Sequence, residues 1–123
     1  MDINEKKEIA IKELSKTFKL AAEGVDIKMF SKFIDNIWHE MQSDKEQYER
    51  FCIDSCGHII HHSGESGAGP IDFVRIYEEK FGKMPDVWFM DAEGNLDAEN
   101  FIKHIEGSTV STGWDCTPTH NCL

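Results

Sequence analysis

Apolar residues recur every three or four positions through much of the chain, which is the spacing of one face of an α-helix. The pattern predicts a first helix over residues 4–23 that ends at Gly24. Its apolar face consists of Ile11, Leu14, Phe18 and Ala21. A second helix is predicted after Asp26, a residue that can cap a helix N-terminus, and it carries the strongest apolar stripe of the chain. That stripe consists of Phe30, Phe33, Ile34, Ile37, Trp38 and Met41.

Shorter apolar patterns predict three further helices. The boundaries of two of them rest on capping residues and helix breakers: Ser43 or Asp44 before the third helix, Gly57 after it, Pro70 at the start of the fourth and Gly82 after it. The last helix is predicted over residues 97–106, and residues 87–90 form a short buried strand or turn. The sequence therefore predicts an all-α fold, a compact bundle of about five helices with one short hairpin near residue 88.

The pattern stops after Gly107. Residues 108–123 have no helical period, only one charged residue (Asp115), and many hydroxyl side chains. Small residues over 63–69 predict a flexible loop in the middle of the chain. We therefore expect a helical domain over residues 1–107 followed by a Cys/Ser/Thr-rich C-terminal tail over residues 108–123.

Charge narrows the classes of partner. The 123 residues carry a formal net charge of −10, whereas nucleic acids and anionic membranes attract clustered Lys and Arg. The sequence therefore predicts no nucleic-acid partner and no membrane partner, and it contains no apolar run of the ~20 residues that a membrane span requires. The N-terminal residues do not resemble a secretory signal, so we expect a cytoplasmic protein whose cysteines are thiols, metal ligands or modification sites.

Histidines and cysteines concentrate in the centre of the chain. His39, Cys52, His61 and His62 are the candidate ligands of a transition metal, with zinc first because it accepts mixed His/Cys sets. Asp35 lies one helical turn before His39, where a carboxylate orients a metal-bound imidazole. We expect the four side chains to converge, because a short connection at residue 43 folds the third helix back beside the second. The alternative is that the histidines make structural hydrogen bonds instead.

Three short motifs in this region resemble the signature of bacterial and plant glycine-rich domain-containing proteins. They are Asp35-x-x-Trp38-His39, Tyr48-x-x-Phe51-Cys52 and Gly57-x-x-x-His61-His62. The match covers about the middle third of the chain, with the motifs in order and at compatible spacing. The resemblance selects these residues but implies no particular reaction, and this chain lacks the long glycine-rich tail of that family.

The C-terminal tail has a different candidate chemistry. Residues 116–122 resemble a Cys-Thr-x-Thr-x-Glu-Cys element of some lantibiotic peptides, with Asn121 in place of the glutamate. In such peptides hydroxyls are eliminated and thiols add to the resulting alkenes. The candidate modification sites are Thr112, Cys116, Thr117, Thr119 and Cys122. Three interpretations remain open: an ordinary tail, the core of a peptide precursor, and metal ligation by the tail.

Two functions therefore compete. The first is a small non-catalytic helical domain with a His/Cys cluster that binds zinc. The second is a ribosomally synthesised peptide precursor, whose folded domain is the recognition leader and whose tail is the substrate of a modifying enzyme. No nucleophile, base and oxyanion arrangement can be assembled from the sequence, so we do not expect an enzyme. The sequence does not predict the oligomeric state.

Overall fold

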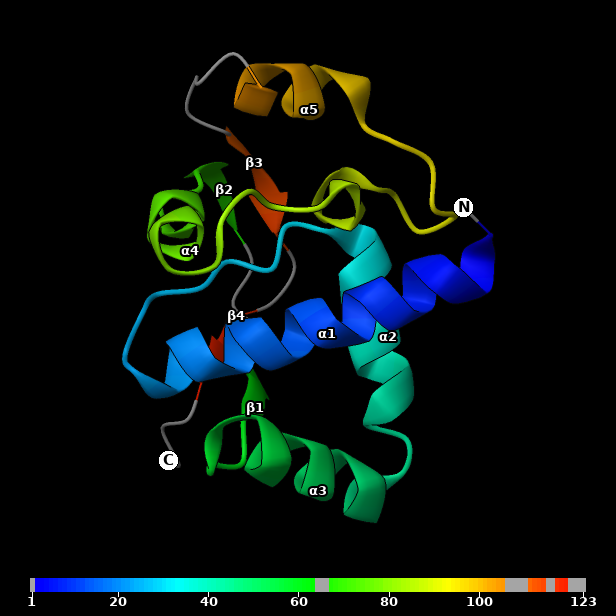
Figure 1. Ribbon diagram of the computed structural model, residues 1–123, viewed down its shortest axis with the longest axis vertical. Helices are drawn as coiled ribbons and strands as arrows, with labels where there is room; N and C mark the ends of the chain where they lie inside the picture. Colours follow the sequence, from blue (N-terminus) through cyan, green and yellow to red (C-terminus); the bar gives the residue numbers. More distant parts are fainter. Residues whose placement is uncertain (1, 64–66, 106–110, 115–116, 120–123) are drawn as a thin grey trace.

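The computed structural model describes residues 2–63, 67–105, 111–114 and 117–119 (Figure 1). Only the backbone is described for 111–114, 117–119, His62, Ser63, Pro70, Asn100, Lys103 and Ile105. This part of the chain is mainly helical, as the sequence predicts. Its helices are α1 (Ile3–Ala22), α2 (Lys32–Met41), α3 (Lys45–Cys56), α4 (Phe73–Phe81), the 3₁₀-helix η1 (Asp86–Phe89) and α5 (Ala98–Ile105). Its strands are β1 (His61–Ser63), β2 (Gly67–Pro70), β3 (Ser111–Trp114) and β4 (Thr117–Thr119).

Helix α1 crosses the middle of the molecule and packs against both α2 and α3 (Figure 1). Asp2 begins the helix, because its carboxylate accepts a 2.8 Å hydrogen bond from the Glu5 amide. The buried face of α1 consists of Ala10, Glu13, Leu14, Thr17, Phe18, Leu20 and Ala21. Ile11, which the sequence pattern places on that face, is 38 % exposed. The buried face of α1 is therefore rotated about the helix axis relative to the predicted apolar stripe, towards the side that carries Ala10, Glu13 and Thr17.

The start of α2 differs from the prediction. The cap is Ser31 and not Asp26, and the residues between them are not helical. The Ser31 hydroxyl accepts a 3.2 Å hydrogen bond from the Ile34 amide and donates a 2.7 Å bond to the Val87 carbonyl. This hydroxyl is buried, so it satisfies the helix end and also ties α2 to η1. The predicted apolar stripe is buried except for Met41, which is half-buried, and Trp38 is fully inaccessible to solvent.

The predicted ends of α3 and α4 are confirmed, but the start of α4 is not. Asp44 caps α3 and Gly57 ends it in the left-handed region, at φ 78°. Gly82 ends α4. The helix begins after Asp72, two residues beyond Pro70, because Pro70 belongs to strand β2 and pairs with Ser111.

The segment around Trp88 is a buried 3₁₀-helix, η1, which agrees with the predicted turn and not with the alternative of a strand. A reversal follows it, in which the Asp91 carboxylate accepts hydrogen bonds from the amides of Glu93 and Asn95 at 3.0 and 2.9 Å. This turn returns the chain so that Met90 and Leu96 form a single antiparallel bridge. The hairpin predicted near residue 88 is therefore reduced to this one bridge. The last helix, α5, agrees with its predicted range to within one residue at each end.

Two pieces of the predicted tail are strands that pair with the centre of the chain. β4 pairs antiparallel with β1, and Thr119 lies opposite His61. β3 pairs antiparallel with β2, and Trp114 lies opposite Gly67. The expected flexible loop over 63–69 is therefore wrong for residues 63 and 67–69, where backbone pairing fixes the chain. Three residues separate β1 from β2, whereas two separate β3 from β4. The pairing of β2 with β3 is therefore shifted by one residue from the pairing that would continue the register of β1 with β4.

Candidate functional site

Asp35 and His39 form a pair on one face of α2. The Asp35 side chain is largely buried, whereas the side chain of His39 is 52 % exposed. Their atoms Oδ2 and Nε2 lie 3.4 Å apart, one helical turn along the chain. The carboxylate therefore stands where the sequence places it, beside the imidazole that it was expected to orient.

Cys52 lies on the buried side of α3. Its thiol is inaccessible to solvent and belongs to the apolar core. Burial raises the pKa of the Cys52 thiol because a thiolate would lose its hydration, and hydrogen bonding to the Ile60 backbone and to Tyr48 acts in the opposite direction. Cys56, one turn later, is half-buried, and its sulfur lies 3.4 Å from the carbonyls of Cys52 and His58, either of which can accept the thiol hydrogen.

The two adjacent histidines lie in β1. His61 is exposed and His62 lies opposite Pro118, but the side chain of His62 is outside the described part. Among the side chains that the structure describes, no three His, Cys, Asp or Glu residues gather as a group that could hold a metal ion. His39, Cys52 and His61 are among these side chains, so the expected convergence is not observed for these three. Zinc binding by the full set with His62 stays a prediction.

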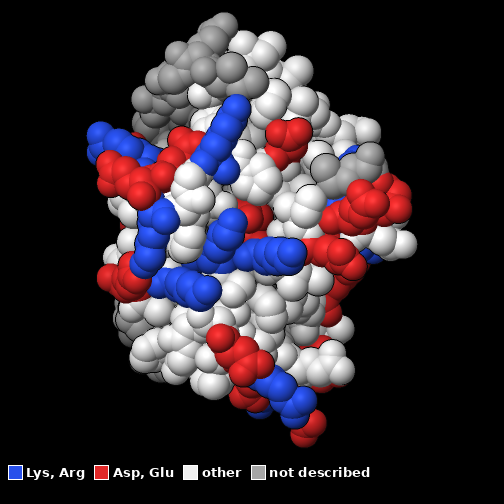
Figure 2. All heavy atoms as spheres, in the orientation of Figure 1, with Lys and Arg blue, Asp and Glu red and all other residues white. Residues whose placement is uncertain are grey.

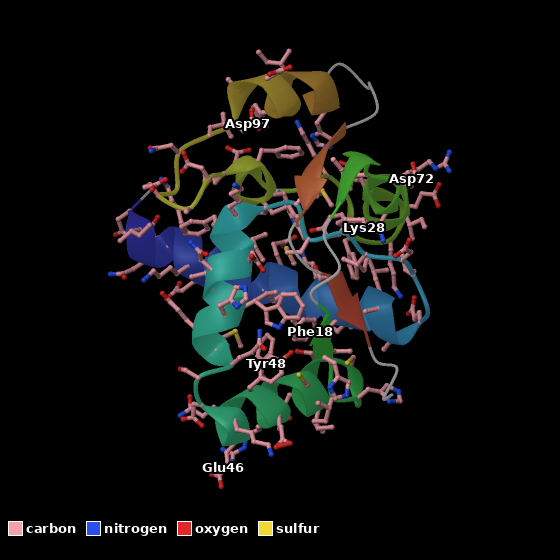
Figure 3. The ribbon with its side chains drawn as sticks, turned by 180° about the vertical axis from the view of Figure 1, so that it is seen from behind. Phe18, Lys28, Glu46, Tyr48, Asp72 and Asp97 are labelled. Atoms are coloured by element: carbon pink, nitrogen blue, oxygen red, sulfur yellow. The ribbon has the colours of Figure 1, made fainter. Side chains whose placement is uncertain are left out.

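The motif residues Trp38 and Tyr48 form what we call the Trp38 cluster, together with the carbonyl of Ile60. The indole Nε1 of Trp38 donates a 2.9 Å hydrogen bond to the Tyr48 hydroxyl, which donates a 2.5 Å bond to the Ile60 carbonyl. The Tyr48 ring also meets Phe18 of α1 edge to face at 6.2 Å, and the two side chains approach each other in Figure 3. These contacts join α2, α3 and the residue just before β1.

The candidate modification sites divide into two groups. Thr112 lies in β3 opposite Gly69, whereas Thr117 and Thr119 lie in β4 opposite Ser63 and His61. Their backbones are extended and paired. The candidate thiols, Cys116 and Cys122, lie outside the described residues.

A second polar cluster was not predicted from the sequence. It is centred on Glu13 of α1, which is only 2 % exposed. We call Glu13 and the three residues that contact its carboxylate, Lys16, Tyr77 and Trp88, the Trp88 cluster. One carboxylate oxygen, Oε1, accepts hydrogen bonds from the Trp88 indole at 2.8 Å and from the Tyr77 hydroxyl. The other, Oε2, lies 3.0 Å from the Lys16 ammonium. The only available signal was the alignment of Glu13 with Ala10 and Thr17 on one side of the helix.

The sequence reasoning also missed a contact that attaches α5 to the body. His104 lies 2.9 Å from the Glu78 carboxylate of α4 through Nε2, and its ring stacks on Phe89 at 4.9 Å. Its other ring nitrogen, Nδ1, is buried and has no hydrogen-bond partner among the residues described. Phe101, on the same helix, meets Phe89 edge to face at 5.7 Å. Two side chains of α5 therefore hold it against η1.

None of the described helices is long and apolar enough to cross a membrane. No protein-family model matches the chain, and neither a curated protein nor a solved structure matches it significantly. The resemblance to glycine-rich domain-containing proteins therefore rests on the three quoted motifs alone and stays a prediction.

Proposed function

We propose that the chain is a non-catalytic helical domain that carries its own Ser/Thr/Cys-rich C-terminal segment and presents it to a modifying enzyme. The observation that carries this proposal is the antiparallel pairing of β4 with β1 and of β3 with β2. Both tail strands are added to segments from the centre of the chain, so the domain and the candidate substrate meet through their backbones.

Backbone pairing suits a carrier of this kind. Hydrogen bonds between main chains hold an added strand in place whatever its side chains are. The receiving strand β2 has small residues, Gly67-Ala68-Gly69, beside β3. A segment held in this way stays extended while its side chains can vary.

The reaction proposed for the tail is elimination followed by addition. Loss of water from a threonine leaves a double bond between Cα and Cβ. A cysteine thiol then adds across this bond, with sulfur bonding to Cβ and a proton to Cα. Each thioether therefore forms with the net loss of one water and without an oxidant. The hydroxyl candidates are Thr112, Thr117 and Thr119, and the thiol candidates are Cys116 and Cys122.

The burial of the domain's most interconnected ionisable groups supports a role without catalysis. Glu13, Tyr48 and Tyr77 each make hydrogen bonds to other protein groups, and all three are less than 9 % exposed. A catalytic acid or base must reach the proton that it transfers. These groups stabilise the helices around them and are closed to a substrate.

Intact mass measurement of the protein from its native cell tests the proposal. We expect masses lower than the unmodified value by multiples of about 18 Da, with the loss localised by fragmentation to residues 108–123. Thr117→Val in the same cell should remove one such step, whereas Thr17→Val, a buried threonine of α1, should remove none. An unmodified mass in cells that produce the protein together with its genomic neighbours would contradict the proposal.

We propose zinc binding by His39, Cys52, His61 and His62 as a second candidate function. Its support is the Asp35–His39 pair, in which the carboxylate is held largely buried beside an imidazole that remains half-exposed. A metal-bound histidine commonly has such a partner on its other ring nitrogen. Zinc would close this site by linking α2, α3 and β1.

Metal analysis of protein purified without chelator or histidine tag tests this second candidate. We expect one zinc per chain and a rise in melting temperature when zinc is added, both lost in His39→Ala and in Cys52→Ser. His104→Ala is the matched control, because it removes a histidine that is not in the set. Absence of bound zinc, together with no rise in melting temperature, would contradict zinc binding.

A further inference from the structure

Three lysines follow one face of α1. Lys12, Lys16 and Lys19 are spaced four and three residues apart, so they lie on the same side of the helix. Basic side chains gather over this helix and towards α4 on the face seen in Figure 2. Within the described part of the chain, no ion pair involves Lys12 or Lys19, and both side chains are exposed. This concentration stands out on a chain of net charge −10.

An aromatic ring lies beside this row. Phe81, the last residue of α4, is half-buried, and the ammonium groups of Lys16 and Lys80 lie 5.7 and 5.8 Å from its ring centre. Lys80 also pairs with Glu23 at the end of α1. The surface therefore combines cations from two helices with an accessible apolar group, and we call it the lysine face (Lys12, Lys16, Lys19, Lys80 and Phe81).

The lysine face is short and has acidic ends. Lys12 and Lys19 are separated by seven residues, or about 10 Å along the helix axis. Glu8 lies one turn before Lys12, and Glu23 lies one turn after Lys19, on the same side of the helix. A nucleic acid or an anionic membrane would extend past these glutamates and meet the negative charge of the rest of the molecule. A partner with only two or three carboxylates fits the available length.

We propose that the lysine face docks an acidic segment of another protein. Carboxylates of the partner pair with Lys12 and Lys19, and an apolar side chain between them contacts Phe81. Lys16 keeps its contact with Glu13 and adds positive charge between the two exposed lysines. The lysines give the surface its preference for carboxylates, and the flanking glutamates limit how long the acidic segment can be. This inference stands independently of any modification of the tail.

The test uses the full chain and a synthetic helical peptide with three glutamates at four-residue spacing. Backbone amide NMR spectra should shift on residues 12–19 and near Phe81, and the shifts should disappear as salt rises from about 0.05 to 0.5 M because added salt screens exposed charges. Lys12→Glu/Lys19→Glu should weaken binding by about tenfold or more. Lys32→Glu/Lys45→Glu is the matched control, since it makes the same charge change at two exposed lysines of α2 and α3.

Additional variants and competing ligands identify the class of partner. Lys12→Gln/Lys19→Gln, which removes charge without reversing it, should weaken binding by an intermediate amount, and thermal melts of each variant establish that it is folded. A peptide with glutamines in place of the glutamates, a ten-nucleotide single-stranded DNA and phosphatidylserine vesicles should each bind more weakly than the acidic peptide. The proposal is overturned if the acidic peptide does not bind, if the control pair weakens it equally, or if DNA or vesicles bind more tightly.

Discussion

The two buried tryptophans both donate their indole N–H to a side-chain oxygen, but the acceptor differs between them. Both Trp38 and Trp88 are completely buried, and a buried indole N–H needs a hydrogen-bond acceptor. In the Trp38 cluster the indole donates to the Tyr48 hydroxyl, and this hydroxyl donates in turn to the Ile60 carbonyl. In the Trp88 cluster the indole and the Tyr77 hydroxyl both donate to one oxygen of Glu13.

The role of the tyrosine therefore differs between the clusters. Tyr48 links two buried groups, because its hydroxyl accepts from the Trp38 indole and donates to the Ile60 carbonyl. The Tyr77 hydroxyl also accepts a hydrogen bond, at 3.4 Å from the part-exposed Lys16 ammonium, but it donates to a carboxylate that has Trp88 and Lys16 as further partners. A neutral chain of hydrogen bonds depends on its middle member, whereas a buried carboxylate with several donors can lose one and keep the others.

Replacing either tryptophan with alanine should produce the largest effect, and it should be similar in the two clusters. We expect Trp38→Ala and Trp88→Ala each to lower the free energy of unfolding by roughly 3–5 kcal/mol, because each leaves a large cavity in a packed core. Urea denaturation followed by circular dichroism measures this. Near-wild-type stability of Trp38→Ala would contradict both its burial and the apolar stripe of α2.

The Trp38 cluster was partly accessible to sequence reasoning because its members are close in the chain. Trp38 lies on the strongest apolar stripe, and Tyr48 follows it by ten residues on the next helix. Helical period, the Asp44 cap and the stop at Gly57 together bring α3 back beside α2. Short connections leave few ways to pack two consecutive helices, so local patterns were sufficient.

The Trp88 cluster could not be predicted in this way. Tyr77 and Trp88 are 64 and 75 residues from Glu13, so no local pattern brings them together. A glutamate in a helix is normally solvent-exposed, and the hydrophobic pattern therefore assigned α1 a buried face centred away from it. The strands of the tail could not be predicted from local patterns either. Strand pairing joins backbone groups of distant segments, so it produces no helical period in the sequence.

The two tyrosines give the sharpest test of the difference between the clusters. Tyr48→Phe should lower the free energy of unfolding by about 2–3 kcal/mol, because the Trp38 indole N–H and the Ile60 carbonyl both lose a buried partner. Tyr77→Phe should cost only about 1 kcal/mol, because Glu13 keeps the Trp88 and Lys16 contacts, and the part-exposed Lys16 ammonium, which also donates to the Tyr77 hydroxyl, keeps Glu13 and solvent as partners. Each variant removes one hydroxyl from one ring, so they are matched controls for each other. Equal losses in urea denaturation would mean that the other donors to Glu13 do not compensate for the lost Tyr77 hydroxyl.

High pH should act on both clusters together. The chain has two tyrosines, and burial raises the pKa of Tyr48 and of Tyr77 above the ordinary value of 10.0. In the unfolded chain both ionise near pH 10, so the stability contributed by keeping them neutral is complete below pH 10 and declines above it. We expect a loss of about 1.4 kcal/mol per pH unit for each tyrosine above pH 10.

Absorbance at the phenolate band, recorded alongside circular dichroism, measures this effect. Both tyrosines should stay neutral past pH 10 and ionise only as the protein unfolds. Tyr77→Phe leaves Tyr48 as the single reporter, and Tyr48→Phe does the converse. Phenolate absorbance that rises near pH 10 while the helical signal is unchanged would contradict the burial of whichever tyrosine remains.

Deleting residues 108–123 should have the smallest effect on stability and should distinguish the two clusters by position. Ile60, the acceptor in the Trp38 cluster, directly precedes β1, which pairs with β4 of the tail. The Trp88 cluster draws its members from α1, α4 and η1, none of which pairs with a described tail strand, although β4 also packs against α1. Because paired short strands are only marginally stable by themselves, the deletion should cost about 1 kcal/mol, or roughly 4 °C in melting temperature.

Hydrogen exchange of the indole N–H groups should quicken more at Trp38 than at Trp88, since loss of β4 frees the strand next to Ile60. Ser111→Pro is the matched control, because it alters β3 opposite β2 and leaves the β1–β4 pair in place. A truncated chain that fails to fold, or one in which Trp88 is the more affected indole, would mean that the tail stabilises the centre of the domain and not only its β1 edge.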